Sequence, residues 1–213
     1  GAESPVALRG VTWPDWVADA TSALNNLLND VEKVIVFGHS MGGLVALSLA
    51  ADHTEKIDSL IVAAAAIQST SPLAPGNPLH FLMPPLAPIL RLFIRRKALA
   101  PNYADPALNA SHTNYPWAPI DAILSFLHFT QVTRRRLPEV NVPILIMHSH
   151  NDSVIAPKSA KIIYSDVTTP AAEKRLVWFD KTEHEMFRDC EREATTGAVV
   201  AYVRERIAVG EVS

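Results

Sequence analysis

VIVFGHSMGG, at positions 34–43, is the stretch of sequence that decides the fold. Its first four residues are apolar and mostly β-branched, which is typical of a strand covered on both faces of a parallel sheet. The residues from Met41 to about His53 are small and apolar on nearly every side, which indicates a helix packed against that sheet. Between the two lies Gly-x-Ser-x-Gly, a pattern that raises a serine hydroxyl on a sharp strand-to-helix turn. Ser40 is therefore a candidate nucleophile, with His39 beside it, and Gly38 and Gly42 are expected to leave room for the strand and helix to approach closely.

On either side of this stretch, short apolar strands alternate with amphipathic helices. We expect helices beginning after Thr12 and after Pro157 and at about 194–207, and further strands at 59–64, 144–148 and 175–179. Because strands and helices alternate, the pattern predicts an α/β protein with a mostly parallel sheet and helices on both faces.

The segment 68–138 interrupts this alternation with many prolines and apolar residues, and we predict that it is an insertion without strands. It is expected to consist of helices, one of them over 120–130, and proline turns that cap the sheet. Residues 1–67 and 139–213 then form the core, and 68–138 form a helical, proline-rich cap or lid. The apolar stretch 79–94 within it is either cap core or a surface that meets lipid or an apolar substrate.

Charge and composition exclude several classes of function. A net charge of -3 over 213 residues does not indicate a nucleic-acid-binding protein, because such proteins neutralise phosphates with many lysines and arginines. The apolar stretches 60–67 and 79–94 are too short to cross a bilayer, so no stable membrane insertion is expected. The single cysteine, Cys190, permits a reducing compartment, and we expect a cytoplasmic location. An export signal stays open, because residue 1 need not be the natural start.

A serine hydroxyl is a weak nucleophile at neutral pH, so the sequence should also supply a histidine and a carboxylate to orient it. Asp152 follows the strand expected at 144–148, and His184 follows the strand expected at 175–179. Both lie just beyond the carboxyl ends of parallel strands, where open α/β sheets place their sites. The rival carboxylates for the role of Asp152 are Asp166 and Asp180.

His148, His150 and Asp152 also form a His-x-His-x-Asp run of the kind that binds zinc in metallo-hydrolases. Such a site needs a further ligand at the next position, which is occupied by Ser153. The zinc reading also leaves the glycine-flanked serine unexplained. We therefore expect neither a metal nor a cofactor.

The order Ser40, Asp152, His184, together with GHSMGG at 38–43 and DSVIAP at 152–157, resembles the α/β-hydrolase carboxylesterases and monoacylglycerol lipases. The resemblance extends over essentially the whole chain. It implies that Ser40 is the nucleophile, Asp152 the triad acid and His184 the general base, while the backbone amide of Met41 is one oxyanion-hole donor. It also implies hydrolysis of small apolar carboxylic esters, with short to medium acyl chains or monoacylglycerol-like structure.

The chain departs from this family pattern at its beginning. Family members have further strands before the helix expected after Thr12, and a His-Gly loop that supplies the second oxyanion donor; this sequence contains no His-Gly pair. The resemblance therefore implies an N-terminally shortened hydrolase, either a fragment or a natural variant. The alternative to an active esterase is a catalytically impaired hydrolase or a binding module with an apolar pocket. An uncovered side of the sheet would favour a homo-oligomer.

Overall fold

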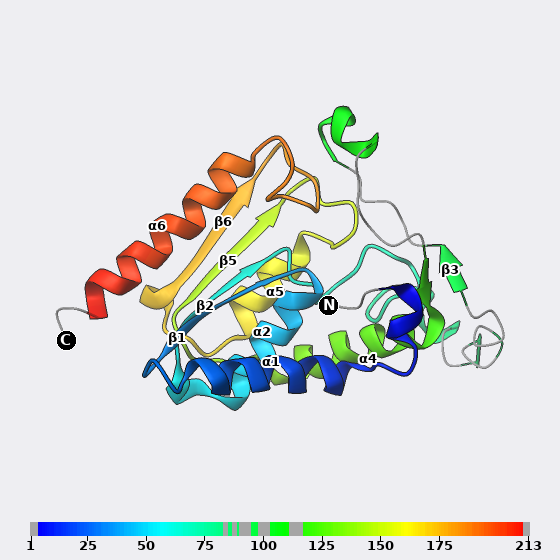
Figure 1. The fold of residues 1–213 in the computed structure, drawn as a ribbon. Helices are drawn as coiled ribbons and strands as arrows, with labels where there is room; N and C mark the ends of the chain where they lie inside the picture. The colour runs from blue at the N-terminus through cyan, green and yellow to red at the C-terminus, as the bar shows by residue number, and fades with distance from the viewer. Residues whose placement is uncertain are drawn as a thin grey trace.

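The computed structural model describes residues 4–82, 85–86, 89, 95–97, 103–110 and 117–210, and Figure 1 shows their arrangement. Its centre is a four-stranded sheet in the order β1-β2-β5-β6, with every neighbouring pair parallel. The strands are β1 (Val34–His39), β2 (Ile57–Ala63), β5 (Ile144–Ser149) and β6 (Lys174–Phe179). The parallel α/β architecture predicted from the sequence is confirmed.

Helices cover both faces of this sheet (Figure 1). They are α1 (Trp13–Leu27), α2 (Met41–Asp52), α4 (Ile120–Arg136), α5 (Lys158–Asp166) and α6 (Arg192–Gly210). Side chains alternate between the two faces along a strand. On β2, Leu60 and Val62 join the core shared with α1, α2, α4 and α5, while Ile61 and Ala63 join the core under α6. Burial on both faces explains why the strands are continuously apolar.

The first long helix, α1, is fixed at both its start and its apolar face. The carboxylate of Asp15 accepts hydrogen bonds from the backbone N–H of Thr12 at 2.8 Å and from its hydroxyl at 2.9 Å. Trp13 stacks on Phe129 of α4, with ring centroids 5.1 Å apart. The N-terminal helix therefore packs directly against the long helix of the insertion.

The insertion 68–138 differs from the prediction in containing strands. Arg95–Lys97 (β3) and Trp117–Pro119 (β4) form an antiparallel pair. A pair of three-residue strands depends on backbone hydrogen bonds and has too little side-chain alternation to be seen in the sequence. The helix predicted at 120–130 is confirmed and extends to Arg136, as α4.

The apolar stretch 79–94 is only partly described. Leu79, Phe81 and Ile89 are exposed, so these three side chains are not cap core. Leu82 and Leu86 are half-buried, and Met83, Leu90, Phe93 and Ile94 lie outside the described residues.

Strand β1 lies at one edge of the sheet. No strand in the described ranges pairs with its outer side, and the Phe37 side chain is 48% exposed. An assembly that covers this edge stays a prediction. None of the described helices is both long enough and apolar enough to span a membrane.

Candidate active site

Ser40 occupies a strained turn between β1 and α2. Its backbone has φ 53° and ψ -118°, a conformation that residues with a side chain rarely adopt. Three backbone hydrogen bonds hold it there: its N–H donates to Ala63 at 2.9 Å, and its carbonyl accepts from Gly43 at 3.0 Å and Ala66 at 3.2 Å. The turn is thus held from both the end of β2 and the first turn of α2, and it places the hydroxyl beyond the carboxyl end of the sheet.

Gly38 and Gly43 make the close approach of strand and helix possible, whereas the sequence predicts Gly38 and Gly42 for this role. A Cβ atom on Gly38 would collide with the carbonyl of Gly42 and lie 2.8 Å from the Cβ of Ala46. A Cβ on Gly43 would lie 2.6 Å from that of Ala65. The expectation that Gly42 leaves room is wrong, because a Cβ there meets nothing within 4 Å. Gly43 has that role, since the second residue of the helix turns outward while the third faces the chain that follows β2.

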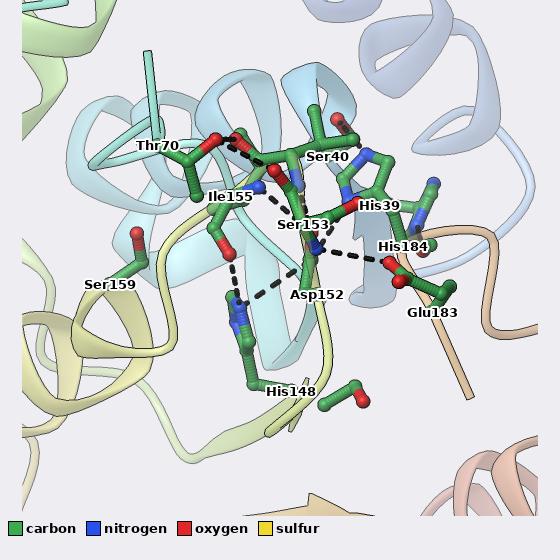
Figure 2. Close-up of polar contacts among 12 residues, drawn as sticks. His39, Ser40, Thr70, His148, Asp152, Ser153, Ile155, Ser159, Glu183 and His184 are labelled. Carbon is green, nitrogen blue, oxygen red and sulfur yellow. Dashed lines mark hydrogen bonds and ion pairs between the residues drawn. The ribbon is translucent and has the colours of Figure 1, made fainter. Parts of the chain in front are cut away.

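The structure brings Ser40, Asp152 and His184 together in one hydrogen-bonded chain (Figure 2). His184 Nε2 lies 2.9 Å from Ser40 Oγ, and His184 Nδ1 lies 2.8 Å from Asp152 Oδ2. The carboxylate and the imidazole are both buried. The rival carboxylates lie elsewhere, since Asp166 ends α5 and Asp180 is exposed beside His150.

The second oxygen of Asp152 is fixed by the backbone. Oδ1 accepts the N–H groups of Val154 at 2.9 Å and Ile155 at 2.8 Å. Burial raises the pKa of this carboxyl, but the hydrogen bond and charge of His184 and the two N–H groups outweigh it, so the pKa lies below its ordinary value. Asp152 is therefore an ionised carboxylate with one oxygen directed at His184.

Two further histidines lie against this group, and His148 Nε2 is 3.5 Å from Asp152 Oδ2 (Figure 2). His39 Nε2 donates to the backbone carbonyl of His184 at 2.9 Å, and His148 Nε2 donates to the carbonyl of Ile155 at 3.2 Å. A carbonyl can only accept, so each Nε2 carries a proton. Burial lowers the pKa of both imidazoles, and for His39 the neighbouring His184 lowers it further.

The loops after β5 and β6 are joined by contacts that the sequence did not reveal. The Ser149 hydroxyl donates to the carbonyl of Thr182. The backbone N–H of Ser153 donates to the Glu183 carboxylate at 3.0 Å (Figure 2). The first residues of the insertion take part as well, because the Thr70 hydroxyl donates to the carbonyl of Ser153 at 2.7 Å. The loop with Asp152 is therefore held between the insertion and the loop with His184.

The alternative zinc site does not form from the predicted residues. The imidazole of His148 is buried against the backbone, whereas that of His150 is half exposed and stacks on Trp178 with ring centroids 4.3 Å apart. The two histidines thus point to different surroundings. Among the described residues, no group of three histidine, cysteine, aspartate or glutamate side chains is arranged to hold a metal ion.

Met41, the expected oxyanion donor, is the first residue of α2. The first N–H groups of a helix have no intrahelical acceptor, and the helix dipole makes this end favourable to negative charge. Met41 directly follows the candidate nucleophile in the chain, and its role as an oxyanion donor stays a prediction.

Comparisons with known proteins agree with this architecture. The chain is similar to a structure from a study of LipS and LipT, two metagenome-derived lipolytic enzymes, at 23% identity and a TM-score of 0.79 over 95% of this chain and 78% of that one. It is similar to the monoacylglycerol lipase of Paleococcus ferrophilus at 18% identity and a TM-score of 0.76, over 92% of this chain and 76% of that one. It is also similar to a soluble variant of monoglyceride lipase from Saccharomyces cerevisiae, at 18% identity and a TM-score of 0.72, over 91% of this chain and 68% of that one. These likenesses show the α/β-hydrolase fold. The family model for serine aminopeptidase, S33, matches residues 6–191, so the chain belongs to this hydrolase family.

Proposed function

We propose that the protein is a serine hydrolase that cleaves carboxylic esters through an acyl-enzyme on Ser40. The observation that supports this most strongly is the hydrogen-bonded chain from Ser40 Oγ through His184 to Asp152. Neither a strained serine turn nor a buried Asp-His pair is by itself specific to serine hydrolases. Their convergence at the carboxyl ends of three parallel strands is the arrangement that acyl transfer requires.

The first half of the reaction forms the acyl-enzyme. His184 Nε2 takes the proton of the Ser40 hydroxyl while Oγ attacks the ester carbonyl carbon, and Asp152 stabilises the imidazolium through Nδ1–H. The carbonyl oxygen becomes an oxyanion, which the backbone N–H of Met41 stabilises by donating a hydrogen bond. The tetrahedral intermediate collapses, the C–O bond to the alcohol breaks, and the alkoxide leaves with the proton from His184.

The second half releases the acid. His184 removes a proton from water, the hydroxide adds to the acyl carbon, and Ser40 Oγ leaves and recovers the proton. The overall reaction consumes one ester and one water and yields an alcohol and a carboxylic acid, and none of its steps calls for a cofactor.

The substrate we propose has an apolar acyl group of short to medium length or a monoacylglycerol-like structure. Two of the similar structures are of monoacylglycerol or monoglyceride lipases, which supports this class. The insertion 68–138, which we propose acts as a cap, begins beside the site, because the backbone N–H of Thr70 donates to the carbonyl of Val154 at 3.0 Å. It also presents the exposed apolar side chains of Leu79 and Phe81.

A second candidate function is a binding module or an impaired hydrolase that keeps the pocket and turns over slowly. Among the described residues, the backbone N–H of Met41 is the one oxyanion donor that we assign. Loss of one oxyanion donor lowers turnover by about a hundredfold to a thousandfold, so the two candidates differ in rate.

The test is hydrolysis of p-nitrophenyl esters from acetate to palmitate, with labelling by a fluorophosphonate that reacts only with an activated serine. Ser40→Ala should abolish both. Ser22→Ala is the matched control, because Ser22 is exposed on α1, and it should leave both unchanged. Labelling with very slow ester turnover would favour the impaired hydrolase, and equal activity in wild type and Ser40→Ala would refute the serine mechanism.

A further inference from the structure

Asp189 is a buried carboxylate outside the chain of contacts described so far. It lies five residues after His184, in the loop between β6 and α6, and is only 2% exposed. A buried charge is costly unless hydrogen bonds compensate it, so its partners identify what it does.

The first set of partners belongs to its own loop. Asp189 Oδ2 accepts the backbone N–H of Glu183 at 2.7 Å and the hydroxyl of Thr182 at 3.3 Å, while Oδ1 accepts the N–H of Cys190 at 2.8 Å. Glu183 directly precedes His184. The carboxylate therefore fixes the backbone from which the imidazole projects.

The second set of partners belongs to the insertion, about 85 positions earlier in the chain. Oδ2 also accepts the N–H of Ala104 at 2.9 Å, and Oδ1 accepts the N–H of Asp105 at 3.1 Å. Figure 1 shows the segment 103–110 as a short green helical piece next to the β6–α6 loop. The contact is reinforced nearby, because the guanidinium of Arg188 lies over the ring of the buried Tyr103, 5.9 Å from its centre.

The charge of this group is stabilised by the same contacts. Burial raises the pKa of the Asp189 carboxyl, but the N–H groups of Glu183, Ala104, Asp105 and Cys190 outweigh it and bring the pKa below its ordinary value. An ionised carboxylate can accept all these bonds at once, whereas an amide has a single acceptor oxygen. Each carboxylate oxygen accepts an N–H group from both segments, so asparagine at this position must leave one N–H group of the loop and one of the insertion unpaired.

We propose that Asp189 is a positioning residue that couples the insertion to His184. One carboxylate holds both the residue before His184 and the segment at 104–105, so the direction of the imidazole and the placement of the insertion depend on each other. The inference rests on the proposed function, because it assigns a role relative to the proposed general base.

The test compares Asp189→Asn with Glu191→Ala. The Glu191 carboxylate accepts the N–H groups of Lys181 and Thr182, both at 2.8 Å, so it caps the same loop, but no contact with the insertion is recorded for it among the described residues. The matched variants thus separate capping of the loop from its coupling to the insertion. Two measurements are made on each: the rate of labelling by a small fluorophosphonate, which does not fill the acyl pocket, and amide hydrogen exchange.

Asp189→Asn should slow labelling by about tenfold to a hundredfold, because a displacement of the base by about 1 Å has effects of this size. The amides of 103–110 and 182–184 should lose protection together. Glu191→Ala should slow labelling less than Asp189→Asn does and leave 103–110 protected. Ala104→Pro, which removes one N–H donor on the insertion side only, should slow labelling in the same direction as Asp189→Asn.

Two results would overturn the coupling. One is unchanged labelling in Asp189→Asn with a higher KM for esters, which would mean that the residue shapes only the pocket. The other is loss of protection in 182–184 while 103–110 stays protected. Failure of the proposed function is distinguishable from both, because the wild type would then not be labelled at all, while hydrogen exchange would still report on the two segments.

Discussion

Replacing Asp152 by asparagine should reverse the direction of the hydrogen bond between residue 152 and His184 Nδ1. In the wild type, Oδ1 accepts two backbone N–H groups and Oδ2 faces His184 Nδ1 at 2.8 Å. An asparagine side chain must keep its oxygen at the Oδ1 position, because an NH2 group there would face two N–H donors. Its nitrogen then takes the place of Oδ2 and donates to Nδ1, so the proton of the neutral imidazole moves to Nε2. That proton points at Ser40 Oγ, 2.9 Å away, and the imidazole cannot act as a base.

The expected loss follows from this tautomer change. Where the same substitution has reversed the tautomer in a serine protease, kcat fell by about 10⁴, which corresponds to about 5.5 kcal/mol in the activation barrier. Asp152→Asn should lose a similar factor in kcat for a short p-nitrophenyl ester at pH 8. The variant should melt cooperatively, and the nitrogen chemical shifts of His184 should show the proton on Nε2.

The matched controls are Asp180→Asn and Asp166→Asn, which change the rival carboxylates. Asp180 is exposed and Asp166 lies at the end of α5, so both variants should keep kcat within about threefold. An Asp152→Asn enzyme with more than a tenth of the wild-type kcat would refute the reasoning, as would an equal loss in Asp180→Asn.

Three further predictions concern the support of the site. Gly43→Ala should lower the free energy of unfolding by about 1–3 kcal/mol, because its methyl group would collide with the chain after β2. Gly42→Ala has open space around the new methyl group and should change this free energy by less than about 1 kcal/mol. Urea denaturation of the two variants measures both changes. His39→Phe removes the N–H that donates to the carbonyl of His184 and should lower kcat about tenfold. His39→Gln should recover part of this loss, because its amide can donate the same hydrogen bond. Equal kcat in the two variants would contradict a supporting role for the His39 N–H. Because the pKa of Asp152 is lowered in the folded state, its charge adds stability that is present above the ordinary carboxyl pKa near 4 and is lost as the pH falls through the lower folded value. The decrease in unfolding free energy below about pH 4 should therefore be smaller in Asp152→Asn, and identical pH profiles would count against a lowered pKa.

Much of the fold could be predicted because its signals are local. The strands are buried on both faces and therefore read as continuous apolar runs, as at 34–37 and 144–148. The antiparallel pair at 95–97 and 117–119 could not be predicted, since its pairing depends on backbone groups brought together from positions about 20 apart.

The site shows the same division. Ser40, Asp152 and His184 could be proposed from the sequence because each residue type follows a predicted strand. Asp189 was missed because its partners are backbone N–H groups, which every residue possesses and no sequence pattern marks. The role of Gly43 was missed because choosing between adjacent glycines requires knowing which one faces the sheet.

The strand order β1-β2-β5-β6 also has a consequence for biosynthesis. Ser40 follows β1, while His184 follows β6, and β2 and β5 lie between these two strands in the sheet. The last of these strands is synthesised well after the first, so a nascent chain that already displays the serine turn has no base to activate it. The growing polypeptide should stay inert toward esters and toward covalent probes until β6 has docked. Recovery of fluorophosphonate labelling during refolding would then report the closing step of sheet assembly, later than the appearance of helical circular dichroism.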